Sequence, residues 1–239
     1  MRRLIAQGLA ELGLEGRVPP QSAQTLERYG ALLLEKNRVM NLTAITQPEQ
    51  VARLHMLDCA ALLNVPGVEL AGKRVIDVGT GAGFPGMVLQ LLCPGARVTL
   101  LDSLGKRLDW LREIAPALGA ERVEIRHGRG EELSHEPDWR ESFDYAVSRA
   151  VAPLEILCEL CLPYVAPGGR LLAMKAVDCE EELSRAARGI ALLGGEPERN
   201  WDYALPGTDV VHRVVVVKKR APTPTGYPRR WTKIQKTPL

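Results

Sequence analysis

The spacing of apolar residues changes character near residue 70. Before that point, Leu26, Tyr29 and Leu33 recur at helical spacing, and another helix is predicted to begin after Pro48. We therefore expect residues 1–70 to form a helical N-terminal extension that packs on the rest of the chain.

From residue 71 to about residue 220, short β-branched runs alternate with helical patterns. This order predicts a mainly parallel sheet with right-handed crossovers and helices on both faces, which is the doubly wound α/β class. The predicted parallel strands are RVIDVG, ARVTLLD, RVEIRHG, FDYAVSRA and GRLLAMKA.

Two further apolar runs close this region without a helix between them. WDYAL and VHRVVVVKK are separated only by PGTDV, which is too short for a crossover helix, so an antiparallel hairpin is predicted. The expected core at residues 71–220 is thus a doubly wound, mainly parallel seven-stranded sheet with a terminal antiparallel hairpin.

Composition places the chain among ordinary globular proteins, because 46% of its 239 residues are hydrophobic and 25% are charged. No apolar stretch approaches the roughly 20 residues that a membrane span requires, and acids and glycines interrupt the N-terminal stretch. We therefore expect a cytoplasmic monomer without a membrane partner.

Five cysteines, an odd number in apolar or helical surroundings, predict reduced thiols rather than a disulfide framework. Cys158 and Cys161 form a C-x-x-C pair one helical turn apart, but no second pair or suitably spaced histidine completes a zinc site. Buried core thiols are expected, with a redox or metal role as the alternative, and no metal is predicted.

Cationic residues are concentrated at the C-terminal end, although the net charge is only +2. No acidic residue follows His212, prolines interrupt the segment, and Tyr227 and Trp231 stand among the cations. Residues 221–239 are therefore expected to form a basic tail that suits a polyanion, because cations neutralise phosphates and aromatic rings stack on bases. A solvated tail that only aids solubility is the alternative.

The densest chemical signal is RVIDVGTGAGFPG, in which an apolar run ends in Asp77 and glycines follow. Ligands of open α/β sheets bind beyond the carboxyl ends of the strands, where glycine allows the backbone to approach them. Gly81, Gly83 and Gly86 fit the G-x-G-x-x-G of dinucleotide binding. The run from Asp77 to Gly83 also fits the D-x-G-x-G-x-G of S-adenosylmethionine (SAM) enzymes.

Asp102, which ends the next strand, is expected to hydrogen-bond a ribose hydroxyl with either cofactor. SAM is favoured because no Tyr-x-x-x-Lys pair or other proton-donor set for hydride transfer lies on the later strands. The terminal hairpin is also a familiar feature of SAM-dependent methyltransferase sheets. An NAD(P)-dependent oxidoreductase is the alternative.

Several segments spread over nearly the whole chain carry a family resemblance: NRVMNLTAIT, DVGTGAGFPG, LLDSLGKR, HGRGEEL, SRAVAPLEILCELCLPYVAPGGRLLAMK and YPRRWTKIQKTPL. Together they resemble the glucose-inhibited division protein B family, whose members are bacterial 16S rRNA guanine-N(7) methyltransferases. The resemblance implies a class I SAM-dependent methyltransferase sheet and S-adenosylhomocysteine as product. It also implies 16S rRNA or the small ribosomal subunit as partner. Thr80 stands where a serine is frequent, and Ala176 where many members carry glycine.

The resemblance and the physical argument together imply where the methionine and ribose parts of SAM bind. Gly79 allows the backbone to approach the methionine half, Phe84 provides an aromatic wall, and Asp102 binds the ribose. Arg149 follows a buried strand at the carboxyl edge and is expected to face the site as a cofactor-binding and catalytic residue. An ion pair that anchors this strand is the alternative role for Arg149, because buried charges are usually paired.

Four further residues are expected on the adenine side. Ser103 and Leu104 flank the ring, although Ser103 equally suits the N-cap of the next helix. Gly130 and Glu131 resemble adenine-side contacts of the family, whereas Glu131 by itself would be an exposed acid in a first helical turn.

Cations near the strand ends and in the tail are expected to bind RNA. Lys106, Arg129 and Lys175 are proposed to contact phosphates or guanine, with solvated surface as the alternative. Arg229 and Arg230 are the RNA-binding candidates of the tail.

Polar residues of the N-terminal part match recurrent positions of the family. Asn37, Asn41, His55 and Asp58 are expected to cap or pack locally, and Asn41 in NLT could end a helix. A lid-like contribution to the RNA site is the alternative.

The implied reaction requires little acid–base chemistry from the protein. N(7) of guanine keeps an in-plane lone pair, so no general base is required, and alignment supplies the rate enhancement. The rivals are a SAM methyltransferase acting on another RNA and an RNA-binding protein without chemistry.

Overall fold

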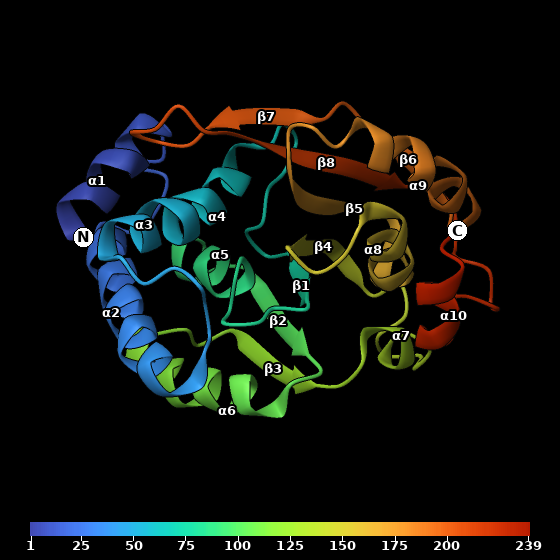
Figure 1. Ribbon diagram of the computed structural model, residues 1–239, viewed down its shortest axis with the longest axis horizontal. Coiled ribbons are helices and arrows are strands. Elements are labelled where there is room, and N and C mark those ends of the chain that lie inside the picture. Colours follow the sequence, from blue (N-terminus) through green and yellow to red (C-terminus); the bar gives the residue numbers. More distant parts are fainter.

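The computed structural model describes residues 1–239 and places one sheet between two layers of helices (Figure 1). The strands are β1 (Arg74–Val78), β2 (Arg97–Asp102), β3 (Val123–His127), β4 (Phe143–Arg149), β5 (Val165–Ala176), β6 (Gly195–Pro197), β7 (Trp201–Ala204) and β8 (Val211–Lys219). They lie in the order β3-β2-β1-β4-β5-β8-β6, with β7 also paired to β8. The first five strands are parallel and β8 is antiparallel to β5, which confirms the predicted doubly wound, mainly parallel α/β sheet.

The prediction of seven strands was one too few, because the structure adds the short strand β6. β6 pairs with the end of β8 and β7 pairs with its beginning, so both lie along the same edge and together fill the seventh position. A three-residue strand that contains Gly195 and Pro197 carries almost no strand signal. The predicted hairpin of β7 and β8 is confirmed, with Trp201 opposite Val214.

Helical segments precede the sheet and then alternate with its strands. The N-terminal ones are α1 (Arg2–Glu11), α2 (Ser22–Met40), α3 (Pro48–Val51), a π-helix (Ala52–Leu57), α4 (Asp58–Ala60) and a 3₁₀-helix (Ala61–Asn64). The later α-helices are α5 (Gly86–Leu92), α6 (Gly105–Ile114), α7 (Gly130–Leu133), α8 (Leu154–Cys161), α9 (Glu180–Leu192) and α10 (Trp231–Lys236). None of them has both the length and the apolar character needed to cross a membrane.

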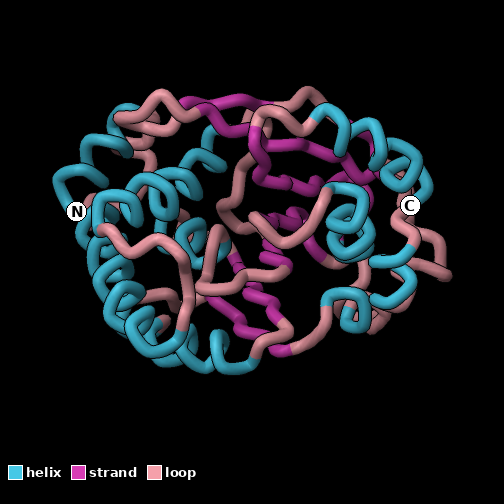
Figure 2. The backbone as a smooth tube through the Cα atoms, in the orientation of Figure 1, coloured by secondary structure: helices cyan, strands magenta, loops and turns pink.

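Successive residues of the central strands bury their side chains in two different cores, as the period of two in a strand requires. Val75 packs with the N-terminal helices, α5 and α6, whereas Ile76 packs with α8, α9 and α10. Figure 2 shows the strands as a band between these two helical layers. The N-terminal helices therefore share one hydrophobic core with the sheet and position the site from that side.

Cys158 and Cys161 lie in the second core and are fully buried, which confirms the prediction of buried thiols. Burial raises the pKa of the Cys158 thiol to about 12. A thiol in this state is neither a nucleophile nor a metal ligand at neutral pH.

The C-terminal segment that the sequence marked as a basic tail folds back onto the protein. Ile234 of α10 is fully buried, and α10 contacts α8 (Figure 1). The Arg140 guanidinium donates to the carbonyl oxygens of Thr223, Pro224 and Tyr227. Prolines keep the segment free of regular secondary structure up to residue 230. The hydrogen bonds from the Arg140 side chain hold it in place of backbone hydrogen bonds.

Lys219, the last residue of β8, is fully buried despite its charge. Its Nζ donates to the carbonyl oxygens of Leu193 (2.8 Å) and Leu162 (3.1 Å) and lies 3.4 Å from a Glu141 carboxylate oxygen. Burial lowers the pKa of Lys219 to about 8. This ammonium group connects the end of the sheet to the segment that follows it.

Replacing this ammonium group with an isosteric apolar chain should destabilise the fold. Lys219→Met removes the charged donor shared by the Leu162 and Leu193 carbonyls and the cation beside Glu141, so we expect the free energy of unfolding to fall by about 2–3 kcal/mol in urea denaturation. Lys218→Met is the matched control, because Lys218 is only half-buried and donates to a single carbonyl. Equal losses in the two variants would contradict a structural role for the buried ammonium group.

Candidate active site

The glycine-rich turn after β1 is held by two buried carboxyl groups. Asp77 Oδ2 accepts hydrogen bonds from Thr80 Oγ1 (2.6 Å) and from the Gly86 amide (2.8 Å). Asp102 Oδ2 accepts from the Gly81 amide (2.8 Å). The turn is therefore shaped by carboxylates of the strands on either side of it.

Gly79 is the position in this turn where a side chain would meet the loop after β4. Its φ is +76°, and an added Cβ would lie 2.6 Å from Cγ2 of Val151. Val151 comes from the loop after β4, next to Ala150, whose φ is +54°. Two loops at the carboxyl edge thus approach each other at a distance that only glycine permits.

The amide groups of the turn are largely satisfied by the protein itself. Gly79 and Thr80 donate to the Leu101 carbonyl, and Gly83 and Phe84 donate to the Thr80 carbonyl. Dinucleotide-binding turns instead direct free amides and a helix N-terminus at a pyrophosphate.

The carboxyl group of Asp77 already occupies the start of α5, where a phosphate would bind. Burial raises its pKa to about 7, although the hydrogen bonds from Thr80 and Gly86 oppose this shift. A carboxyl group in this position argues against the dinucleotide alternative.

A cavity of about 450 Å³ lies beside this turn, at the carboxyl ends of β1, β2 and β3. This volume is within the range of about 300–1,000 Å³ that is typical of ligand pockets. Of the residues predicted to bind cofactor, those that line it are Gly79, Asp102, Ser103, Leu104, Gly130 and Glu131. Residues that the sequence did not single out for this cavity include Arg107, Val151 and Trp231.

The lining suits an adenosine-containing ligand. Asp102 is 7% exposed and offers a carboxylate to hydroxyl groups, while Leu104 (51% exposed) and Val151 (38% exposed) offer apolar surface to a flat ring. Glu131 is buried and its Oε1 lies 2.5 Å from Nε of Arg129. The residues present therefore fit SAM, and no cluster of three or more His, Cys, Asp or Glu side chains could hold a metal ion.

A second cavity, of about 430 Å³, lies at the carboxyl ends of β4 and β5. Ala150 lines both cavities, so the two are neighbours at the same edge of the sheet. The polar side chains of the second cavity are His55, Asp58, Arg149, Lys175 and His212. The site is therefore a pair of adjoining pockets rather than one.

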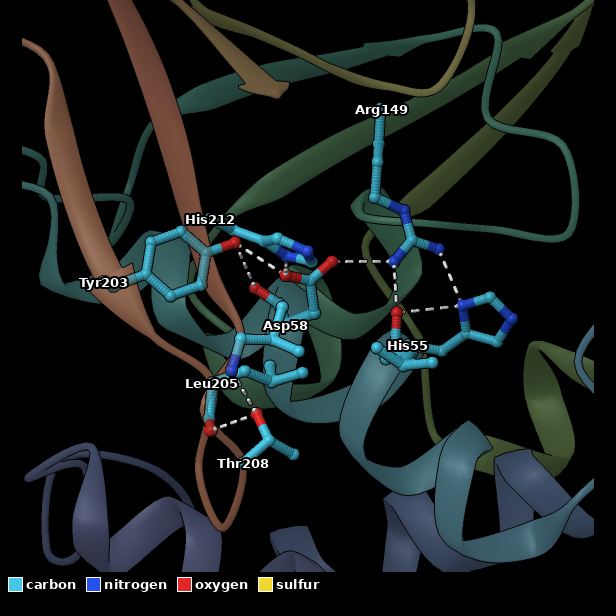
Figure 3. A network of polar contacts seen from close by, with 9 residues as sticks. His55, Asp58, Arg149, Tyr203, Leu205, Thr208 and His212 are labelled. Carbon is cyan, nitrogen blue, oxygen red and sulfur yellow. Dashed lines mark hydrogen bonds and ion pairs between the residues drawn. The ribbon is translucent and has the colours of Figure 1, made fainter. Parts of the chain in front are cut away.

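Arg149 takes part in a polar network at this second cavity and does not line the first (Figure 3). Its guanidinium donates to Asp58 Oδ2 (3.0 Å), to the Leu54 carbonyl (2.7 Å) and to His55 Nδ1 (2.9 Å). This differs from the expectation that Arg149 faces the cofactor. The geometry favours the alternative, an ion pair that anchors the end of β4.

Asp58 is the acceptor at the centre of the network. Besides Arg149, it accepts from the Tyr203 hydroxyl (2.6 Å) and from His212 Nδ1 (2.7 Å). Burial acts to raise the pKa of Asp58, but the His212 hydrogen bond and the Arg149 charge outweigh it, so the pKa is lowered. The same hydrogen bond raises the pKa of His212.

His55 lies in the π-helix, a wider turn that is often found at functional sites. Burial and the charge of Arg149 lower its pKa to about 4, so the ring is neutral at pH 7. A neutral ring can accept from Arg149 at Nδ1 and donate from Nε2 to Thr43 Oγ1 (2.9 Å).

Phe84 also departs from its expected position. Its ring stacks on His55 with centroids 4.5 Å apart, and the Arg149 guanidinium lies 5.1 Å from its centroid. Phe84 is 5% exposed and does not line the first cavity. Its ring therefore packs against the polar network and does not form a wall against the cofactor.

Asn37 and Asn41 have the local roles that the sequence favoured. Asn37 accepts from the amides of Leu42 and Thr43 and donates to the Thr43 carbonyl, which fixes the chain after α2. Asn41 is the C-cap of α2 in the left-handed conformation, with φ +46°.

The five predicted RNA-binding cations occupy different environments. Lys175 pairs with Glu182 (2.6 Å), and Arg229 pairs with the fully buried Glu159 (2.6 Å). Arg129 is half-buried and pairs with Glu131. Of these five cations, Lys106 and Arg230 are exposed and have no ion-pair partner.

Removing the Arg149 guanidinium should unfold the protein more easily. Arg149→Ala leaves Asp58 buried without its cationic partner, so we expect a loss of about 3 kcal/mol in the free energy of unfolding. Arg185→Ala is the control, because Arg185 makes exposed ion pairs and should lose less than about 1 kcal/mol. If Arg149→Ala were as stable as Arg185→Ala, the guanidinium would be free to serve a ligand instead.

Comparisons with known proteins show the family of the chain. The model of the GidB family, described as rRNA small subunit methyltransferase G, matches residues 22–201. The "Ribosomal RNA small subunit methyltransferase G" of Alkaliphilus metalliredigens is 41% identical over 238 residues, covering 100% of this chain and 98% of the relative. The protein of the same name from Symbiobacterium thermophilum is 43% identical over 243 residues, with coverage of 100% and 98%.

Among solved structures, TrmN from Thermus thermophilus is similar with a TM-score of 0.52 at 24% identity, covering 68% of this chain and 48% of that one. At this identity the similarity shows the fold alone. The matches to the family and its members extend over most or all of the chain. By this measure the chain belongs to the rRNA small subunit methyltransferase G family.

Proposed function

We propose that this methyltransferase transfers the methyl group of SAM to N(7) of a guanine in the 16S rRNA of the small ribosomal subunit. The observation that carries the proposal is the cavity between Gly79 and Asp102, beside a turn whose amides are already hydrogen-bonded. Such a cavity fits a nucleoside with an amino-acid part better than a pyrophosphate. Membership of the family adds the RNA substrate.

The roles of the cofactor residues follow from their places in the first cavity. Gly79 gives the methionine part access to the backbone, and Asp102 accepts from the ribose hydroxyls. Its Oδ atoms already bind the amides of Gly81 and Leu104, which fixes the carboxylate plane before any ligand arrives. Ser103, Leu104, Gly130 and Glu131 complete the adenine side.

We place the target base in the second cavity, next to the first across Ala150. Bound SAM supplies an electrophilic methyl group, and N(7) of guanine needs no deprotonation to accept it. The chain therefore has to hold the base in line and exclude water, for which proximity can supply roughly 7–11 kcal/mol. Arg149 acts here by holding the cavity wall, and Lys175 lines the cavity as a candidate contact to the base.

RNA would reach these cavities as an unpaired or extruded nucleotide, because the major groove of an RNA helix is too deep and narrow for side chains to read. Lys106 and Arg230 are exposed and adjoin the cavity-lining residues Arg107 and Trp231. They are therefore the strongest candidates for phosphate contacts at the entrance.

Gly79→Ala should weaken cofactor binding without unfolding the protein. The new Cβ forces Val151 to move into the cavity, so we expect the affinity for S-adenosylhomocysteine to fall at least about tenfold in calorimetric titration. Gly72→Ala is the control, because Gly72 has nearly the same φ (+75°) but no atom within 4 Å of the added Cβ. Both variants should lose about 1 kcal/mol of stability through backbone strain. Equal affinities in the two variants would remove Gly79 from the site.

The activity itself is tested with labelled SAM and small-subunit rRNA, offered as free RNA and as assembled subunits. We expect label in the RNA, and chemical cleavage at N(7)-methylguanine should map it to one nucleotide. The Gly79→Ala variant serves as a control and should label the RNA less at low SAM concentration. Label at another atom or in another RNA would refute the proposed substrate, and binding of NADH instead of S-adenosylhomocysteine would restore the oxidoreductase alternative.

A further inference from the structure

Trp231 lines the first cavity although it comes from the C-terminal segment, far in sequence from the strands that form the cavity. We propose that Trp231 stacks on the adenine ring of the bound cofactor and closes that end of the cavity. The proposal rests on the proposed function, because it takes the ligand to be SAM.

The indole ring is already oriented by a charged neighbour. The Arg129 guanidinium lies over it, 5.5 Å from the ring centroid, and Nε of Arg129 contacts Glu131 at 2.5 Å. The ring packs against the second core and also lines the cavity, so part of its surface is available to a planar ligand. Trp231 itself is only half-buried.

The backbone on both sides of Trp231 is fixed to the body of the protein. Arg229 binds the fully buried Glu159 through Nε (2.8 Å), through the other guanidinium nitrogen Nη2 (2.6 Å) and through its own amide (2.8 Å). Pro228 accepts from His135 Nε2 (2.8 Å), and Ile234 is buried in the second core. An aromatic ring on such a support is preorganised, so a ligand does not have to pay for ordering it.

The chemistry of the wall identifies which part of the cofactor it contacts. Trp231 and Leu104 present aromatic and aliphatic surface to the cavity, and Leu104 is one of the few large apolar side chains that the protein exposes. The methionine part carries an ammonium and a carboxylate, which an apolar wall would desolvate at a cost. Trp231 also lies against Arg129 after β3, on the side of Gly130 and Glu131. Adenine is the flat, uncharged part that this wall fits.

The test measures ligand binding rather than turnover. Trp231→Ala should weaken S-adenosylhomocysteine and 5′-methylthioadenosine alike, each by about tenfold or more in calorimetric titration, because stacking on a base is worth about 1–3 kcal/mol. Trp231→Phe keeps a ring and should lose less than about threefold.

Tryptophan fluorescence gives a second readout. It does not use the alanine variant, so it remains valid if Trp231→Ala folds poorly. Ligand binding should change the emission of the wild-type protein and of the control variant Trp201→Phe. Trp201 is a suitable control because its indole ring stacks on Tyr203 in β7, at the far edge of the sheet. The change should vanish in Trp231→Phe, whose melting temperature should match the wild type.

Three results would overturn the proposal. These are unchanged affinity of Trp231→Ala, a loss for S-adenosylhomocysteine without one for 5′-methylthioadenosine, and an unaltered fluorescence response in Trp231→Phe. Absence of any S-adenosylhomocysteine binding to the wild-type protein would instead defeat the proposed function.

Discussion

Two buried carboxyl groups determine the shape of the glycine turn, and the cofactor site depends on that shape. Asp77 and Asp102 bind amides of the turn from the strands on either side, so the backbone at Gly79 is set before a ligand arrives. The arrangement is costly, because Asp77 is completely buried and its Oδ1 has no hydrogen-bond partner. A buried carboxyl group that lowers the stability of the fold can be retained because it preorganises a binding surface.

The network around Asp58 performs a similar task for the second cavity. It joins α4 of the N-terminal region, directly after the π-helix, to β4, β7 and β8 through Arg149, Tyr203 and His212. The Leu54 carbonyl of the π-helix also accepts from Arg149. The N-terminal helices are thus part of the site and not only a cover, because they supply one half of its buried ion pair.

The sequence allowed the strands and the hairpin to be predicted from local signals, and local signals together with the family resemblance identified most of the named residues that line the first cavity. Asp102 and Gly79 each follow directly from a strand end and a glycine pattern. The position of Arg149 could be predicted but not its partner, since Asp58 lies far away in sequence and any of many carboxylates could have met it. β6 was not predicted, because a three-residue strand that contains glycine and proline has neither the length nor the residue types that indicate a strand.

The C-terminal segment shows why a charge pattern in the sequence does not reveal which cations are free to bind RNA. Without acids nearby in sequence, its cations looked free, yet Lys219 and Arg229 are neutralised by Glu141 and Glu159 from other parts of the chain. What this pairing fixes in space is Trp231, and with it one wall of the cofactor cavity. Arg230, the neighbouring exposed cation, then stands at the same wall but faces solvent. Cofactor and RNA would therefore meet opposite sides of one short segment, so its removal would impair both.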